Sequence, residues 1–192
     1  MEAEHLKVAD RNNVGLLNLT QISAEFQTNG TETDGVNSVA GEGNIMGFRV
    51  GGLGFLVDPG IYCEVIERSQ VNPLPNMKRW FSGLLNLRGN IVPVIDLAIL
   101  LGGAPAENKK RHLFAIDQGE RTMALWIDSL PEIQQVRLQS PDRLAPLSPL
   151  LDPYISAACV DKDRIWLKVR FPEFFKALGN QGWQNVDGEP AQ

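Results

Sequence analysis

The sequence has little of what metal, redox and acid–base chemistry require. Only two cysteines and two histidines occur among its 192 residues. Cys63 and Cys159 each fall in an apolar run and make no metal-binding or redox spacing, so both are expected to be small buried side chains without a disulfide. His5 and His112 have no companions that would complete a metal site or a catalytic triad. A phosphate-binding loop and a dinucleotide fingerprint are also missing, and no cofactor or catalytic residue is expected.

Long apolar runs and an excess of positive charge are missing too. No run approaches the roughly 20 residues of a membrane-spanning helix. The first ten residues lack the basic patch and apolar core of a signal peptide. The net charge of −5 and the pI of about 5.1 argue against nucleic acid and anionic membrane surfaces as partners. We therefore expect a cytoplasmic protein without direct membrane insertion.

What the sequence does contain is a series of short apolar runs between Ile45 and Val169, separated by Gly, Pro, Asn and Asp. Their spacing predicts two successive groups of about five short strands, which favours small barrels over a parallel sheet. A polar linker, Ala104–Arg111, separates the groups. Its basic run Lys109–Lys110–Arg111 is expected to be a solvated turn or, alternatively, a partner contact.

The two ends of the chain differ from this strand-rich body. Residues 1–43 are expected to form a flexible leader, because 29–43 are almost all Gly, Asn, Ser, Thr and acidic residues. Val14–Phe26 has some apolar spacing, so it is either a docking helix or a disordered segment. Four apolar residues at helical spacing predict a helix at the end of the body, and 179–192 should be a polar tail. The four are Phe171, Phe174, Phe175 and Leu178.

Residues 83–101 carry the clearest pattern and read G-L-L-N-L-R-G-N-I-V-P-V-I-D-L-A-I-L-L. Two aliphatic runs, Leu84–Arg88 and Ile91–Ile95, are separated only by Gly89 and Asn90, the spacing of a two-residue hairpin. Glycine in the first central position predicts a type II′ turn. The second run is almost wholly apolar, which favours a strand covered on both faces.

Three residues of this stretch have individual meaning. Pro93 lacks the N–H that a ladder needs, so the second strand is expected at a sheet edge or with a bulge. Asp96 stands at the cap position of a short helix that extends to Leu101. Arg88 is the single charge near the hairpin tip, and no acidic residue lies within several positions of it.

The stretch resembles the central signature of the CheW-like domain family, the coupling modules of bacterial chemotaxis arrays, with N-L-R-G and P-V-I-D-L both in place. The resemblance covers about residues 45–178. It implies an all-β fold of two small five-stranded SH3-like barrels packed through a shared apolar seam, with short helices that include one at the C-terminal end. The predicted strand groups place these barrels at about 44–103 and 104–178.

The resemblance further implies a non-enzymatic adaptor. Members of the family bridge the cytoplasmic tip of a methyl-accepting chemoreceptor to the regulatory domain of a CheA-type histidine kinase. Both partners are expected here, and membrane receptor arrays would be reached only through them. One alternative is a small β-barrel ligand-binding protein or enzyme, although its acidic residues are scattered and none is paired with a His or Ser. Another, the regulatory end of a larger kinase, is weakened by the lack of a histidine-kinase domain.

Matching positions select the expected partner-binding residues. Gly83 and Arg88 match the glycine and arginine that the family uses around its receptor-facing groove. Cys63–Glu64–Val65 resembles the family's Q-E-I segment, and Tyr62 stands just before it. The alternatives are a simple bend at Gly83, a core aromatic at Tyr62 and a solvated strand residue at Glu64. The full set of expected partner-binding residues is Arg88, Gly83, Tyr62, Glu64, Asn86 and Gly89.

Some positions depart from the family pattern. Residues 157–160 read A-A-C-V where the family often has glycines. Trp80 and Trp166, with the closing F-P-E-F-F-K-A-L, are more similar to the PilI branch of the family, which serves type IV pili and twitching or phototactic motility. The resemblance therefore favours the PilI branch.

Overall fold

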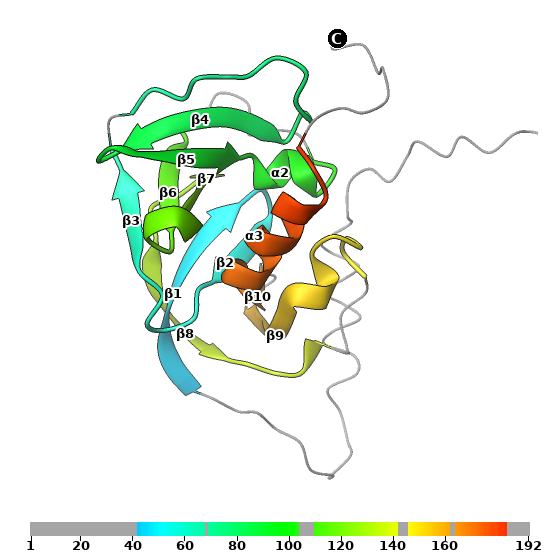
Figure 1. Cartoon of the computed structure of the whole chain (residues 1–192). Coiled ribbons are helices and arrows are strands. Elements are labelled where there is room, and N and C mark those ends of the chain that lie inside the picture. Colours follow the sequence, from blue (N-terminus) through cyan, green and yellow to red (C-terminus); the bar gives the residue numbers. More distant parts are fainter. Residues whose placement is uncertain (1–41, 68, 104–109, 142–145, 162–163, 184–192) are drawn as a thin grey trace, which may run out of the picture.

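The structure is a computed structural model that describes residues 42–67, 69–103, 110–141, 146–161 and 164–183 (Figure 1). The leader up to residue 41, including the apolar Val14–Phe26 segment, lies outside the described residues, as do Lys109 and the end of the tail. Among the described residues, no helix has the length and apolar character needed to cross a membrane.

The described part of the chain forms ten strands in two five-stranded sheets. Sheet A has the spatial order β8 (Glu132–Arg137), β1 (Glu42–Val50), β2 (Leu53–Leu56), β10 (Arg164–Val169) and β9 (Ile155–Asp161). Sheet B has the order β3 (Cys63–Ile66), β6 (His112–Ile116), β7 (Met123–Ile127), β5 (Asn90–Ile95) and β4 (Phe81–Leu87). The helices are α2 (Leu97–Leu100) and α3 (Phe171–Asn180), with single 3-10 turns at η1 (Gly119–Arg121) and η3 (Asp152–Tyr154).

Each sheet closes on itself through one short bridge. In sheet A, Gln139, which follows edge strand β8, pairs with Ala158 of the other edge strand, β9. In sheet B, Asn72, in the loop after β3, pairs with Leu84 of edge strand β4. A sheet that closes has no long unpaired edge. The all-β prediction of two small five-stranded barrels is confirmed.

The division of strands between the barrels differs from the prediction. Residues 44–103 and 104–178 do not form one barrel each, because the first half supplies β1 and β2 to sheet A and β3, β4 and β5 to sheet B. The two halves are joined by β1 with β8 and β2 with β10 in sheet A, and by β3 with β6 and β5 with β7 in sheet B. The pairings of β2 with β10 and of β5 with β7 are parallel. Sequence patterns identify hairpins between neighbouring strands, whereas a parallel pair joins strands that are far apart in the chain.

Three apolar clusters make up the core. One fills barrel A and contains Leu56 and Trp166, and one fills barrel B and contains Leu85 and Val94. The largest lies between the barrels, where Phe48 of sheet A contacts Phe114 of sheet B with 5.1 Å between ring centroids. The predicted apolar seam is confirmed.

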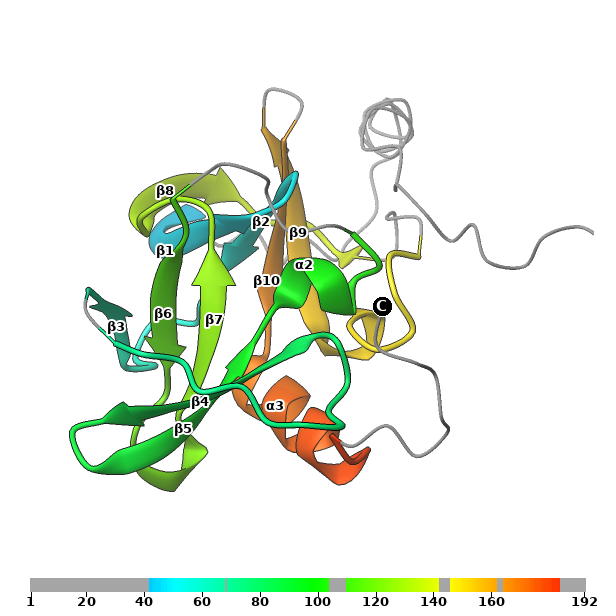
Figure 2. The ribbon, with the colours of Figure 1, turned by 90° about the horizontal axis from the view of Figure 1, so that it is seen from above.

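Helix α3 covers the seam beside strands of both sheets (Figure 1 and Figure 2). Its buried residues are the four predicted from helical spacing, Phe171, Phe174, Phe175 and Leu178. The prediction of a polar tail from residue 179 is wrong for its first part. The helix continues to Asn180, and the Trp183 ring lies 4.9 Å from that of Phe81. A single aromatic residue beyond the helix therefore holds the chain against the body.

Strand β5 lies inside sheet B, between β7 and β4, and not at an edge. It tolerates Pro93 because the parallel ladder with β7 begins only at Val94, so no β7 carbonyl needs an N–H from residue 93. The irregular register is on the facing strand, between Phe81 and Gly83. The prediction that both faces of this strand are buried is wrong at the start of the strand, where Ile91 is 63% exposed.

Candidate partner-binding site

The β4–β5 turn is shifted by one residue from its predicted position. Leu87 pairs with Asn90, so the two central residues are Arg88 and Gly89. Both have positive φ, +53° and +89°, which is the pattern of a type I′ turn and not of type II′. The Asn86 side-chain oxygen accepts a hydrogen bond from the Gly89 N–H at 2.8 Å. Asn86 and Gly89 therefore fix the backbone that presents Arg88.

The turn brings Arg88 to two other predicted site residues. Its Nη2 lies 2.5 Å from Oε2 of Glu64, on β3. The Tyr62 hydroxyl first, and then the Glu64 carboxylate, favour the charged guanidinium and raise the pKa of Arg88 above its ordinary value. Tyr62, Glu64 and Arg88 thus form one cluster at the surface, although Arg88 lies 24 positions from Glu64 in the sequence.

The members of this cluster differ in exposure. The Arg88 side chain is 70% exposed and that of Glu64 is 18% exposed. Arg88 contacts Glu64 through one nitrogen only, and a guanidinium carries five N–H donors. The exposure of Arg88 therefore leaves donors open to solvent, while the Glu64 carboxylate pairs with one of its nitrogens.

Gly83 has a structural role that is separate from the cluster. Its φ is +133°, and a Cβ added there would lie 2.2 Å from the Asn72 carbonyl oxygen. Only glycine permits the loop after β3 to reach β4 so closely. The structure supports the alternative of a bend at Gly83, and its partner contact stays a prediction.

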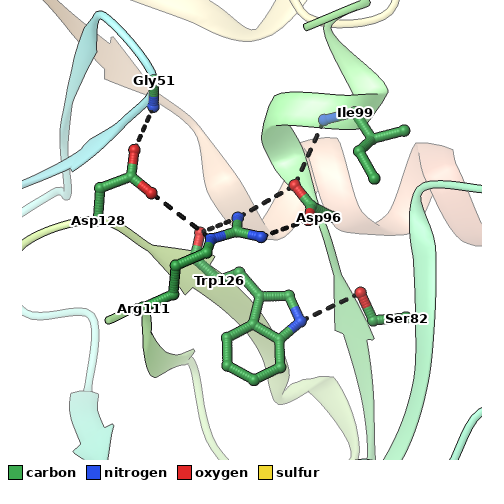
Figure 3. Close-up of polar contacts among 7 residues, drawn as sticks. All are labelled: Gly51, Ser82, Asp96, Ile99, Arg111, Trp126 and Asp128. Atoms are coloured by element: carbon green, nitrogen blue, oxygen red, sulfur yellow. Dashed lines mark hydrogen bonds and ion pairs between the residues drawn. The ribbon is translucent and has the colours of Figure 1, made fainter. Parts of the chain in front are cut away.

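A second charged cluster was not predicted (Figure 3). Arg111 Nη1 lies 2.5 Å from Asp96 Oδ2, its Nη2 lies 3.1 Å from Asp96 Oδ1, and its Nε lies 3.5 Å from Asp128 Oδ1. We name Asp96, Arg111 and Asp128 the interbarrel ion network. Asp96 is also the predicted cap of α2 and accepts a hydrogen bond from the Ile99 N–H at 3.3 Å.

The network corrects the expectation for the basic run. The Arg111 side chain is only 13% exposed, so it is not part of a solvated turn. Its guanidinium also lies over the Trp126 ring, 5.7 Å from the centroid. The sequence offered a weak signal, namely an arginine that ends a basic run directly ahead of a buried strand. It could not show that acidic residues apart in the chain meet there.

Large apolar side chains are exposed on the β1–β8 pair of sheet A and in the turn between β7 and β8. Met46 on β1 and Ile133 on β8 are directly opposite each other in the ladder, and both are exposed. Leu130 is exposed in the turn between β7 and β8 and lines a cleft of about 400 Å³ together with Val65 and Ile66 of β3. The cleft is therefore lined by sheet B and its adjoining loops, together with Leu130 in the turn that leads to β8.

Within the described ranges, no three His, Cys, Asp or Glu side chains gather in a way that could hold a metal ion. Acidic residues that looked scattered in the sequence are engaged in ion pairs. Asp58 contacts Lys168, and Asp96 and Asp128 contact Arg111. Glu64 contacts Arg88. The arrangement supplies charge and apolar surface for contact with another molecule.

Comparison with known proteins agrees with this geometry. The model of the CheW-like domain matches residues 44–178, most of the chain. The chain belongs to the CheW-like domain family. Protein PilI of Pseudomonas aeruginosa is 28% identical to it over 124 residues, which is 64% of this chain and 69% of PilI.

Two further relatives bear CheW names. A probable chemotaxis protein CheW of Rhizobium etli is 31% identical over 97 residues, covering 50% of this chain and 63% of that protein. The crystal structure of the scaffolding protein TtCheW from Thermoanaerobacter tengcongensis superimposes with a TM-score of 0.58 at 18% identity, covering 74% of this chain and 98% of TtCheW. This structural likeness supports the fold, and the resemblance to the CheW-like family is confirmed.

Proposed function

We propose that the protein is a non-enzymatic adaptor that couples the cytoplasmic tip of a methyl-accepting chemoreceptor to the regulatory domain of a CheA-type histidine kinase. The observation that carries this proposal is the cluster of Tyr62, Glu64 and Arg88 in a CheW-like domain. The less exposed Glu64 holds the exposed guanidinium of Arg88 on a two-residue turn, so little conformational freedom is lost when a partner binds it. A guanidinium with free donors suits carboxylates and backbone carbonyls of a protein partner.

The exposed apolar residues support a protein partner as well. Met46 is exposed on β1, Ile133 on β8 and Leu130 in the turn before β8, and Tyr62 is exposed just before β3. Exposed apolar side chains and a fixed charge are typical of a protein interface. A receptor tip that presents apolar side chains and a carboxylate would match both features.

The PilI similarity favours a type IV pilus system, with twitching or phototactic motility as the output. The aromatic residues Trp80 and Trp166 and the α3 sequence point the same way. Under this proposal the adaptor works in the cytoplasm and joins membrane receptor arrays through its partners. A ligand-binding barrel is the alternative, but apolar side chains fill both barrel interiors. Copurification of a histidine kinase would support the adaptor, and turnover of a small molecule by the protein alone would contradict it.

The decisive experiment reverses the charge of Arg88. Arg88→Glu removes the guanidinium and places a carboxylate opposite partner groups that accept an arginine. We expect a folded protein whose affinity for the receptor tip falls roughly tenfold or more, with a smaller loss for the kinase domain. Titration calorimetry with the receptor tip and the kinase regulatory domain, measured separately, gives both values.

Arg121→Glu is the matched control. Arg121 is 75% exposed and pairs with Asp117 at 3.2 Å, so its reversal removes a comparable surface ion pair from another turn. We expect this variant to bind both partners like the wild type. If Arg88→Glu folds and binds both partners normally, the cluster is not the partner site. If it unfolds the protein, Arg88 is structural.

A further inference from the structure

The interbarrel ion network connects the two sheets through directional contacts. Asp128 follows β7 of sheet B, and its backbone N–H donates to the Arg49 carbonyl of β1 in sheet A at 2.8 Å. Its Oδ2 accepts from the Gly51 N–H, in the turn between β1 and β2, at 2.6 Å. Its Oδ1 lies 3.5 Å from Arg111 Nε, an ion pair without a hydrogen bond, and Arg111 binds Asp96 through two nitrogens (Figure 3). One chain of contacts therefore runs from the sheet A hairpin to the start of α2.

The two barrels do not need this network in order to pack against each other. The large apolar cluster of the seam already joins sheet A, sheet B and α3. Apolar burial is non-directional, whereas hydrogen bonds fix distances and angles, as do those from Arg111 to Asp96 and those that join Asp128 to Arg49 and Gly51. Burying three charged groups also carries a desolvation cost that well-packed apolar residues would avoid. The ion network therefore fixes the relative orientation of the two barrels, which the apolar seam does not.

One member of the network also lines the cleft beside β3 of sheet B. Arg111 lines the cleft together with Val65, Ile66 and Leu130. Leu130 comes two residues after Asp128 in the turn that leads to β8, and Met46 lies on the strand that Asp128 holds through Arg49. A rotation of one barrel against the other would move Leu130 and Met46 relative to Tyr62 and Glu64.

We propose that Arg111 is a positioning residue for partner binding, because the interbarrel ion network sets the relative orientation of the two barrels and hence the position of sheet A and of Leu130 beside the sheet B cleft. The inference rests on the proposed function for its binding consequence, but not for its structural one. Arg111 itself need not contact the partner. It places the sheet A side of the binding surface at the correct distance from the Tyr62, Glu64 and Arg88 cluster.

The test uses a neutral version of the network in the full chain. Arg111→Met alone would leave two buried carboxylates unpaired and could unfold the protein for that reason. The triple variant Asp96→Asn, Arg111→Met and Asp128→Asn removes all three charges together. Asp96→Asn keeps a side-chain oxygen that caps α2, and Asp128→Asn keeps one that accepts from the Gly51 N–H. The matched control is Asp117→Asn with Arg121→Met, which removes an ion pair within one loop of sheet B.

Residual dipolar couplings of the backbone amides measure the relative orientation of the sheets. In the wild type and the control, one alignment tensor should fit both sheets. In the triple variant, we expect each sheet to fit its own tensor, with the two tensors differing in magnitude or direction. Affinity for the receptor tip should fall roughly tenfold.

The outcomes separate the two proposals. A single tensor in the triple variant, or receptor affinity within twofold of the wild type despite separate tensors, overturns the positioning role. A triple variant that fails to fold also overturns it, because the network would then be a requirement for folding. If the wild type binds neither the receptor tip nor the kinase domain, the proposed function fails, and the dipolar couplings still decide whether the network orients the barrels.

Discussion

Gly83 shows how a missing side chain can determine the path of a loop. A Cβ at this position would overlap the Asn72 carbonyl oxygen, which also accepts a hydrogen bond from the Leu84 N–H at 2.9 Å. The clash would be with the backbone of Asn72, not with a flexible side chain. Neither Asn72 nor β4 can move away without breaking the bridge that closes sheet B. The sequence pattern allows Gly83 to be a partner-binding residue or a bend, and the contact with Asn72 explains the bend.

Gly83→Ala is therefore expected to destabilise the protein by roughly 2–4 kcal/mol, the sum of left-handed backbone strain and forced displacement of the loop. Urea unfolding measures the change. Gly60→Ala is the control, because Gly60 has φ of +95° but open space around it. That variant should lose only the strain, about 1–2 kcal/mol. Equal losses of stability in the two variants would show that the loop after β3 can move aside to make room for the Cβ.

Cys63 gives a prediction about reactivity. Burial first, and then the negative charge of Asp117, raise the pKa of this thiol from 9.0 to about 11. The thiolate is the reactive form, so at pH 8 the folded protein should react with iodoacetamide roughly a hundredfold more slowly than the unfolded chain. Measuring the rate in a Cys159→Ala background isolates Cys63. A rate equal to that of the unfolded chain would contradict the prediction.

The same shift affects stability in a defined pH window. Between about pH 9 and pH 11, the unfolded chain releases the Cys63 proton and the folded protein keeps it. The contribution to stability is fully present below the unfolded pKa and is lost as pH rises through the folded one. A stability curve measured from pH 8 to pH 11 should decline, and Cys63→Ala should decline less.

At the scale of elements, β5 has one face in the core and one face partly in solvent. Val94 is fully buried inside barrel B, and Ile91 on the same strand is 63% exposed. Val94→Asp would bury an unpaired carboxylate and should cost roughly 3 kcal/mol or more, or abolish soluble expression. Ile91→Asp should change stability by only about 0.5 kcal/mol. Similar melting temperatures for the two variants would show that β5 is misplaced.

Local patterns predict most elements correctly. The glycine turn after Val50, the strands around Gly119 and the helix at Phe171 depend on neighbours in the chain, and all are present. The hairpin at Arg88 was predicted, but its turn was shifted, because glycine is permitted at either central position. Sequence spacing alone did not predict that Arg88 contacts Glu64 or that Arg111 contacts Asp96, because those side chains meet only when separate strands pair.

At the scale of the whole molecule, the exchange of strands makes each half of the chain incomplete. Residues 42–103 lack β6 and β7 for sheet B, and residues 110–183 lack β1 and β2 for sheet A. We therefore expect that neither fragment folds alone, because each would expose the apolar faces of unpaired strands. Mixed in equal amounts, the two should restore native circular dichroism. A fragment that folds independently would support two sequential barrels instead.

The parallel pairing of β2 with β10 also affects the protein while the ribosome makes it. Leu56 pairs with Lys168, so the partner of β2 is synthesised about 110 residues later. At 5–20 residues per second, that interval lasts roughly 5–20 s. Until β8 is made, about 80 residues after β2, the nascent β1–β2 hairpin carries exposed phenylalanines with no further strand to join. We therefore expect translation speed and chaperone capture during those seconds to affect how much of this chain matures.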